Sequence, residues 1–599
     1  MKYTLLLLVL QCLFFNSIAQ SDKEFSELNT ALNKVLETSQ APGFAVALVK
    51  GDKVIYQKGF GYRDYENKKP VDVNTLFAIG STTKAFTSAI LGQLRDEDKL
   101  TFDDSPIDYV PKLKFHNNEM NNNIIIKDLM SHRTGLPRHD LSWYFFPTKH
   151  NDSLLQRLKY HEPFTGVREQ WYYNNYMFFL QGLIAECITN KSWEENIVER
   201  IFEPLGMKRS NTSIEALEKS SNAAYGYEMK NDSVISKMDY YDIAAMSPAG
   251  SINSSVNEMS NWLITWINKG EFKGETILSQ AYVDEAISSQ MVINGSLPDE
   301  EFPDVYFANY GYGWILSSYK GHYRVSHGGN IDGFSANVTF FPSDSVGVVV
   351  FANQNGSAVP NIVRNIVSDY VLDVRKTDWE KRFKERKEKT QKETQEAQEE
   401  VLSTRVENTS PSHILIDYTG TYHNDGYGTF EINLENDSLY AEFKRLKLYL
   451  KHYHYNVFEP HKVEKLGLDT ISLASLLFNF TTNNVGDISA VKIGLEPTLD
   501  PIVFKRSPNS IDVDLSTLES YVGEYEFSGM VIKIYIKQGN TLYAFVEGQP
   551  EYELIPTEQH KFSLKILEGF KIEFLESKEE SINELLMIQP NGTFKAKRK

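Results

Sequence analysis

A serine and a lysine three positions apart are the first residues in this chain whose types and spacing could carry a reaction. Ser81 follows Gly80 in the stretch FAIGSTTKAFTSAIL, and Lys84 lies three positions further on. The apolar residues that follow recur at helical spacing, which predicts a helix that starts at Ser81 and carries Lys84 one turn along. A nearby amine can accept the hydroxyl proton, and the N–H groups of a first turn can stabilise negative charge. A serine that only caps a helix before a surface lysine would show the same pattern.

Two further motifs supply the groups that a reactive serine would need. Tyr173 and Asn175 lie directly before a predicted helix in WYYNNYMFFLQGLIAE, and His327 precedes Gly328 and Gly329 in VSHGGNIDGF. A tyrosine hydroxyl can relay protons, an asparagine amide can hold a substrate carbonyl, and two glycines let a ligand approach the backbone closely. Each motif alone is a weak signal. All three in this order, separated by long intervals, indicate one active site.

Together the motifs Ser81-x-x-Lys84, Tyr173-x-Asn175 and His327-x-Gly329 resemble those of the penicillin-recognising serine hydrolases. This group includes class C β-lactamases, D-alanyl-D-alanine carboxypeptidases, D-aminopeptidases and related esterases. The resemblance covers roughly residues 22 to 374. Four supporting stretches are similar to the same group: LMSHRTGLP from Leu129, IFEPLGM from Ile201, SPAGSINSS from Ser247 and YGYGW from Tyr310.

The resemblance implies a role for each residue of the motifs. Ser81 would be the nucleophile that accepts the acyl group, and Lys84 and Tyr173 would be its proton-transfer partners. Which of these two is the base stays open. Asn175 would orient the substrate. The backbone N–H groups of Ser81 and Asn330 would form an oxyanion hole, in which each donor contributes about 3 kcal/mol.

The third motif departs from the pattern of β-lactamases and carboxypeptidases, which typically have Lys-Thr-Gly or Lys-Ser-Gly there. A lysine offers a permanent positive charge to the carboxylate of a substrate. His327, with an unperturbed pKa of about 6.5, would be mostly neutral at pH 7 and a weaker partner for an anion. Esterase and aminopeptidase members of the group often carry the histidine. The motif therefore favours a peptide or ester substrate without an obligatory carboxylate.

These observations lead to a functional expectation. The chain is expected to be an exported serine hydrolase that acts through an acyl-enzyme on peptide bonds, including those of D-amino acids, or on esters. The alternatives are a catalytically silent relative that binds peptidoglycan or peptides, and a true β-lactamase. The expected partners are small peptide, ester or β-lactam substrates and peptidoglycan fragments. No cofactor and no metal is expected, and the sequence does not indicate an oligomeric state.

Several elements must position these residues. Residues 43–62 form two β-rich runs around Gly51-Asp52, which predicts a hairpin. Three more strands follow each other in YRVSHGG, FSANVTFFPSD and SVGVVVFANQ, and the long middle has a helical pattern. We therefore predict an α/β (α+β) fold for residues 22–375. Its antiparallel sheet would be flanked by helices, with a helical subdomain inserted, as in the β-lactamase/transpeptidase fold.

The rest of the chain differs from residues 22–375 in its composition and sequence pattern. Residues 376–410 are almost entirely charged or polar, which predicts a solvated helical linker. Beyond it, Tyr418-Thr-Gly-Thr-Tyr422 resembles Tyr521-Val-Gly-Glu-Tyr525, and a Leu-Tyr pair follows each at the same offset. Matched offsets predict two related all-β, barrel-like domains, at residues 411–508 and 513–599.

Charge, cysteine content and the N-terminus limit the compartment and the partners. The net charge of −18 argues against a nucleic-acid partner. Residues 1–20 have the pattern of a cleaved signal peptide, with cleavage after residue 19 or 20, which predicts a periplasmic or secreted protein without a membrane span. Cys187 would then be the only cysteine, and we expect it to be buried in a helix. His132 and His139 are expected to bond to nearby backbone rather than to act in catalysis.

Overall fold

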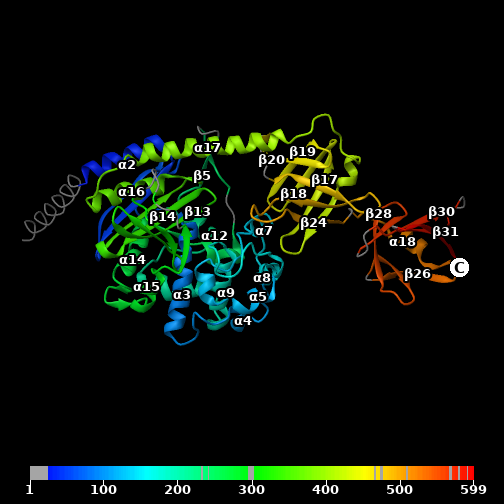
Figure 1. Ribbon diagram of the computed structural model, residues 1–599, viewed down its shortest axis with the longest axis horizontal. Helices are drawn as coiled ribbons and strands as arrows, with labels where there is room; N and C mark the ends of the chain where they lie inside the picture. Colours follow the sequence, from blue (N-terminus) through cyan, green and yellow to red (C-terminus); the bar gives the residue numbers. More distant parts are fainter. Residues whose placement is uncertain are drawn as a thin grey trace, which may run out of the picture. The chain divides into compact units, whose positions relative to one another are not determined.

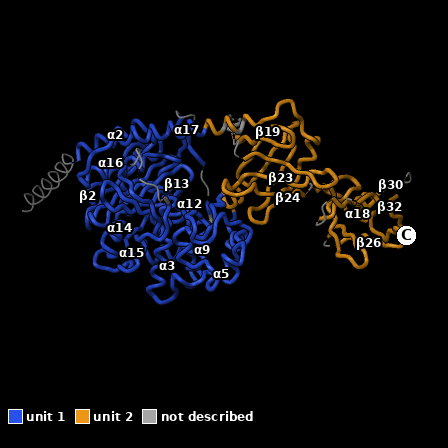
Figure 2. The backbone as a smooth tube through the Cα atoms, viewed as in Figure 1, with its two compact units in different colours: residues 1–140, 148–394 blue, residues 141–147, 395–599 orange. Residues whose placement is uncertain are grey.

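The computed structural model describes two compact units (Figure 2). Unit 1 comprises residues 1–140 and 148–394, and unit 2 comprises residues 141–147 and 395–599. The described residues are 25–230, 234–239, 242–294, 298, 303–464, 467–472, 476–507, 510–537, 539–565, 569–577, 581–589 and 591–599. The expected signal peptide at residues 1–20 lies outside them, and so does Cys12.

Unit 1 is built on a nine-stranded antiparallel sheet in which the first strand of the unit pairs with its last strand (Figure 1). β1 and β2 form the predicted hairpin, and the predicted run of three strands forms β13, β14 and β15. The strands in sheet order are β10 (Met291–Asn294), β11 (Ala308–Tyr310), β12 (Ile315–Tyr319), β13 (His322–Ile331), β14 (Phe334–Phe341), β15 (Val346–Ala352), β1 (Gly43–Lys50), β2 (Lys53–Asp64) and β3 (Lys69–Pro70).

Helices cover this sheet, which is why its central strands are apolar throughout instead of alternating. Every residue of β14 and β15 is buried, and so is every residue of β1 except Lys50. The helices α2 (Ser26–Ser39) and α16 (Val359–Val371) share one core cluster with these strands. The helix α14 (Val256–Ile267) packs against β1 and β15 as well. Strands covered in this way read as continuous hydrophobic runs.

The middle of unit 1 is mostly helical, as the sequence pattern predicts. Its helices are α3 (Lys84–Asp96), α4 (Pro106–Tyr109), α5 (Asn118–Asn123), α6 (Ile126–Met130), α8 (Asn151–Arg157), α9 (Tyr176–Thr189), α10 (Trp193–Ile197), α11 (Glu203–Leu205), α12 (Ile214–Lys219), α13 (Ser247–Gly250) and α15 (Gln280–Ala286). Three short strand pairs interrupt them: β4 (Phe77–Ala78) with β7 (Asn253–Ser254), β5 (Tyr227–Lys230) with β6 (Val234–Lys237), and β8 (Glu271–Phe272) with β9 (Glu275–Thr276). The predicted fold class is confirmed.

One expectation in this region is wrong. Cys187 lies on α9 as predicted, but its side chain is exposed. The first ten residues of α9 are mainly buried on several sides, whereas its last turn reaches the surface. The apolar run identified the helix correctly but could not show where it leaves the core.

The charged stretch after unit 1's sheet forms a single helix, α17 (Trp379–Ser403). Its first residue, Trp379, belongs to the core cluster of unit 1, and its indole N–H donates to a carboxylate oxygen of Asp369 at 2.7 Å. The compact unit continues to Thr394.

Unit 2 holds two all-β domains, as predicted. In β-domain 1, eight strands close into a ring because β19 pairs with β20 as well as with β18, and β21 adds to β20. Its strands are β16 (Gly420–Asn424), β17 (Gly428–Glu435), β18 (Ser438–Phe443), β19 (Leu446–His454), β20 (Val457–Glu464), β21 (Gly467–Ser472), β22 (Phe478–Thr482), β23 (Ile488–Ile493) and β24 (Ile502–Ser507).

β-domain 2 is a closed barrel that follows the short helix α18 (Leu515–Tyr521). Its strands are β25 (Gly523–Phe527), β26 (Met530–Lys537), β27 (Thr541–Val546), β28 (Tyr552–Glu558), β29 (Lys561–Leu564), β30 (Lys571–Glu576), β31 (Ile582–Gln589) and β32 (Gly592–Arg598). The two Tyr-x-Gly-x-Tyr motifs make the same contact, since the second tyrosine hydroxyl donates to the carbonyl of the first: Tyr422 to Tyr418 at 2.7 Å and Tyr525 to Tyr521 at 3.0 Å. This shared contact supports the predicted repeat.

Candidate active site

Lys84 is the residue around which the predicted site is arranged. It is the first residue of α3, directly after a short 3₁₀ turn (Gly80–Thr83) that carries Ser81. Its side chain is completely buried. The amine lies 3.0 Å from the Ser81 hydroxyl, 2.7 Å from the side-chain oxygen of Asn175 and 2.8 Å from the carbonyl oxygen of Ala249. The predicted pair Ser81 and Lys84 is therefore brought together with Asn175, which lies 91 positions after Lys84 in the chain.

The surroundings of this amine favour its neutral form. Burial holds the pKa of Lys84 well below its ordinary value, while the negative charge of Asp140 raises it and the positive charge of Arg138 lowers it further. A neutral amine has two N–H donors and one lone pair. The oxygens of Asn175 and Ala249 can only accept, so the two N–H groups serve them. The lone pair then faces the Ser81 hydroxyl, which is the arrangement that a general base needs.

Tyr173 is the second side chain in contact with the Ser81 hydroxyl. The two side chains are hydrogen-bonded, and the Lys84 amine is 4.8 Å from the centre of the Tyr173 ring. Burial raises the pKa of the Tyr173 phenol, an effect that the bond with Ser81 and the charge of Arg138 reduce only in part. Tyr173 is thus a protonated hydroxyl at neutral pH, placed to give or pass on a proton.

Two residues at this site were not anticipated from the sequence: Arg138 and Asp140. One oxygen of Asp140 accepts from the side-chain amide of Asn175 at 2.8 Å, and the other is held by the Arg138 guanidinium at 2.6 to 2.7 Å. The guanidinium carbon also lies 4.9 Å from the centre of the Tyr173 ring. Both ends of the Asn175 amide are engaged, one with Lys84 and one with Asp140. The only sequence signal was their place just after the stretch LMSHRTGLP.

The third motif lies on β13, next to the serine. A Cβ on Gly329 would come within 2.0 Å of the Ile79 carbonyl oxygen and 3.1 Å of the Ser81 nitrogen, so only glycine allows this approach. The backbone of Asn330 follows at once, and its side chain is exposed. The backbones of Ser81 and Asn330 therefore run beside each other, which is the placement that the predicted oxyanion hole requires.

His327 is almost fully buried and neutral. Its Nδ1 can only donate to the Gly328 carbonyl oxygen, at 2.6 Å, so its Nε2 accepts from the Tyr310 hydroxyl at 2.9 Å. Burial lowers the pKa of His327 to about 3. The ring therefore presents no positive charge to a substrate at neutral pH.

His132 forms part of the aromatic wall behind Tyr173, although we expected only a backbone contact for it. That contact is present, since the backbone N–H of Asn174 donates to its Nδ1 at 3.2 Å. Its ring centre also lies 4.4 Å from that of Tyr173 and 4.8 Å from that of Tyr310. His139, as expected, bonds to backbone, at the carbonyl of Glu162.

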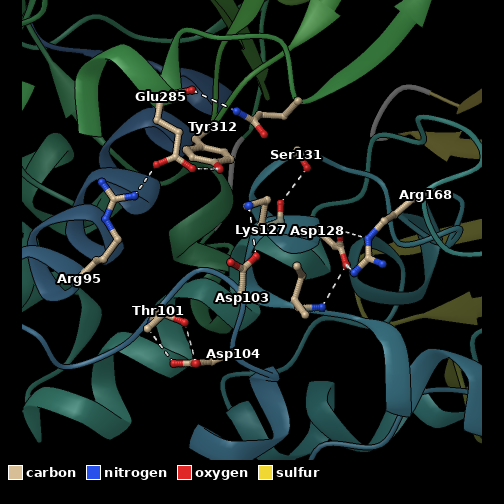
Figure 3. A network of polar contacts seen from close by, with 12 residues as sticks. Arg95, Thr101, Asp103, Asp104, Lys127, Asp128, Ser131, Arg168, Glu285 and Tyr312 are labelled. Atoms are coloured by element: carbon tan, nitrogen blue, oxygen red, sulfur yellow. Dashed lines mark hydrogen bonds and ion pairs between the residues drawn. The ribbon is translucent and has the colours of Figure 1, made fainter. Parts of the chain in front are cut away.

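A polar network around Asp128 supports the loop that carries His132, and Figure 3 shows its contact with Arg168. Asp128 of α6 is fully buried, and it accepts from Arg133 at 2.6 Å and from Arg168 at 2.7 and 2.9 Å. The backbone N–H of Tyr172 donates to the carbonyl of His132 at 3.0 Å. Arg168 lies five residues before Tyr173 and Tyr172 is its direct neighbour, so the bond to Asp128 and the backbone bond to His132 together tie the loop to the Tyr173 motif.

The described residues contain no cluster of three or more histidine, cysteine or acidic side chains placed to hold a metal ion. In the same part of the chain, no helix is both long and apolar enough to cross a membrane.

Comparison with known proteins agrees with this geometry. The model of the β-lactamase family matches residues 28–372, which include every predicted site residue. This protein belongs to the β-lactamase family. A second family model, described as a domain of unknown function (DUF3471), matches residues 404–506, the region of β-domain 1.

The individual relatives described next share between 21% and 28% sequence identity with this β-lactamase family protein. It is 27% identical over 350 residues to "Protein flp" of Staphylococcus aureus (strain MW2), a match that covers 58% of this chain and 66% of that protein. It is 28% identical over 443 residues to "Unguisins hydrolase ungD'" of Aspergillus campestris, covering 71% and 80%. The octameric penicillin-binding protein homologue from Pyrococcus abyssi has a similar fold, with a TM-score of 0.53 and 21% identity, covering 80% of this chain and 99% of that one.

Proposed function

We propose that this β-lactamase family protein is an exported hydrolase that forms an acyl-enzyme on Ser81 and cleaves peptide amides, including those of D-amino acids, or esters. Membership of the family supports a serine hydrolase in general. The observation that carries the more specific proposal is the Lys84 amine, which is buried, held by two acceptors and aimed at the Ser81 hydroxyl at 3.0 Å.

The acylation step follows from these positions. As the Ser81 oxygen attacks the substrate carbonyl, the Lys84 amine takes the hydroxyl proton. The negative charge that develops on the carbonyl oxygen is stabilised by the backbone N–H groups of Ser81 and Asn330. When the bond to the leaving group breaks, that group receives the proton that Lys84 accepted, and the Tyr173 hydroxyl is placed to pass it on.

Deacylation uses the same groups in reverse. A water molecule attacks the ester carbon and gives its proton to the Lys84–Tyr173 pair. The bond to the Ser81 oxygen then breaks, this oxygen recovers a proton, and the product acid leaves. Overall one water is consumed for each bond cleaved. Lys84 is the proton acceptor in this scheme because burial favours its neutral form, whereas the Tyr173 phenol stays protonated.

The neutral His327 supports uncharged substrates. Both of its ring nitrogens are engaged within the protein, and its low pKa leaves it without charge. The carboxylate of a bound substrate would therefore have no fixed positive charge at His327 to pair with. Neutral esters and amides are therefore expected to be better substrates than β-lactams that carry a carboxylate.

The proposal is tested by chemical labelling followed by a substrate screen. A fluorophosphonate probe should add its mass to Ser81 of the native chain and not to Ser81→Ala. A screen of D-amino-acid amides, short esters and a chromogenic cephalosporin should then show turnover of the neutral classes first. Absence of any labelling at Ser81 would favour a catalytically silent binding protein instead. Export is tested separately, by locating the mature N-terminus in the cell fractions.

A further inference from the structure

One segment of the hydrolase chain belongs to unit 2. The chain leaves unit 1 after Asp140, and it returns at Thr148. The segment between, Leu141–Pro147, starts with the short helix α7 (Leu141–Tyr144) and is grouped with β-domain 1 (Figure 2). We call it the anchor segment.

Phe146 is the residue that seats the anchor segment. It is 5% exposed and belongs to the core cluster of β-domain 1. Its ring centre lies 5.4 Å from that of Phe443 and 5.9 Å from that of Phe504, on which it stacks. A Cβ on Gly428 would meet the Phe146 ring at 2.9 Å, so this strand residue leaves room for the ring. The barrel interior is thus completed by a side chain from the hydrolase part of the sequence.

Further contacts hold both sides of Phe146. The neighbouring Phe145 packs on Phe443, with ring centres 5.2 Å apart. The Lys444 amine donates to the backbone carbonyl of Pro147 at 3.0 Å. The anchor segment is therefore fixed by apolar burial in its middle and by a hydrogen bond at its end.

At its other end the anchor segment is continuous with the catalytic network. Asp140 is bonded covalently to Leu141, and its side chain accepts from the Asn175 amide at 2.8 Å. The oxygen of the same Asn175 amide accepts from the Lys84 amine at 2.7 Å. A single peptide bond thus joins the anchor segment to the carboxylate that orients Asn175, and Phe146, the residue buried in the barrel core, follows six positions after Asp140.

We propose that β-domain 1 is a positioning element for the reaction at Ser81: Phe146 seats the anchor segment, which fixes Asp140 and thereby the Asn175 amide that holds Lys84. This inference rests on the acyl-enzyme mechanism proposed above. Asp140 acts only through Asn175, so it is a positioning residue. Small displacements of such a residue can slow a reaction by about a hundredfold.

The test compares Phe146→Ala with the native full-length chain. The measured quantity is the second-order rate at which a fluorophosphonate probe modifies Ser81, followed by intact mass from pH 5 to pH 10. We expect a rate at least about tenfold lower. We also expect the midpoint of the pH profile to move to lower pH, because Asp140 raises the pKa of Lys84 when it is in place. Hydrogen exchange should rise in residues 138–147.

Two matched variants separate positioning from a general loss of stability. Phe458→Ala removes the same volume from the same core, but the ring of Phe458 packs on Tyr418, Phe480 and His452. It should label within about twofold of the native rate and keep the native pH midpoint. Phe146→Leu restores apolar volume at the anchor, so it should recover most of the native rate.

The possible results separate the positioning role of β-domain 1 from the proposed function itself. Labelling of Phe146→Ala at the native rate, with faster exchange in residues 138–147, would overturn the positioning role and leave the proposed function standing. Failure of the native chain to label at all would overturn both. If Phe146→Ala does not fold, Lys444→Ala decides, since it removes the bond to Pro147 without disturbing the core. Slower labelling and a displaced midpoint support the proposal, and native values refute it.

Discussion

Lys84→Met tests whether the Lys84 amine is neutral in the fold, and the test needs no substrate. In the native chain Lys84 is completely buried and its pKa lies well below its ordinary value of 10.5. Between the folded pKa and 10.5, the unfolded chain binds one proton more than the native chain at this position. The free energy of unfolding therefore rises with pH across that window.

The size of this effect follows from linkage. One proton taken up on unfolding changes the free energy by about 1.4 kcal/mol for each pH unit. Relative to Lys84→Met, which has no titrating group there, the native chain should gain about that much for each pH unit between the folded pKa of Lys84 and 10.5. The variant also leaves the oxygens of Asn175 and Ala249 without their donor, at a cost of about 1 to 3 kcal/mol each, largely independent of pH.

The assay is urea unfolding followed by tryptophan fluorescence at several pH values. Six of the seven tryptophans lie in unit 1, so the signal reports mainly on the unit that contains the site. Lys50→Met, which changes an exposed lysine on β1, is the control; it keeps Lys84 and should follow the pH dependence of the native chain. Parallel pH dependences for the native chain and Lys84→Met would refute a neutral Lys84, and with it the role of this amine as the base.

The remaining predictions concern activity and domain structure. Ser81→Ala should abolish turnover and leave the thermal unfolding transition unchanged, and residual activity at the native level would disprove the nucleophile. Tyr173→Phe should lower kcat at least about a hundredfold, the usual effect of losing a proton-transfer partner, as measured by steady-state kinetics. His327→Lys should raise kcat/KM for carboxylate-bearing substrates relative to neutral ones by about tenfold; an unchanged ratio would mean that this wall does not meet the substrate carboxylate. Limited proteolysis should cut first between residues 384 and 409, where α17 is exposed, and earlier cuts inside residues 43–371 would contradict this boundary.

Much of the site could be predicted because its chemistry is concentrated in short motifs. Ser81, Lys84 and Asn175 meet as expected, since each motif lies at the start of a helix whose apolar period is clear. The strand prediction succeeded for the same reason: β1, β14 and β15 are covered on both faces and read as continuous apolar runs.

The parts that could not be predicted depend on tertiary placement. Arg138 and Asp140 lie in a loop with no periodicity, and their role arises only when Asn175 comes within 2.8 Å. Nothing local in Leu141–Pro147 shows that its aromatic residues pack in a core supplied by strands nearly 300 residues later in the chain. The prediction that Cys187 is buried was wrong for a related reason, since the sequence pattern does not show which turn of α9 reaches the surface.

The anchor segment also constrains how the protein is made. Residues 141–147 leave the ribosome long before β-domain 1 is complete, and N-terminal units generally fold first during synthesis. Until the last strand of that barrel, β24 (Ile502–Ser507), has been synthesised, Phe145 and Phe146 have no core to enter. A nascent hydrolase unit would therefore carry an exposed aromatic pair, which is a surface that chaperones bind and that promotes aggregation. A chain shortened to residue 394 would keep that pair exposed permanently, so its solubility should improve when both phenylalanines are replaced by polar residues.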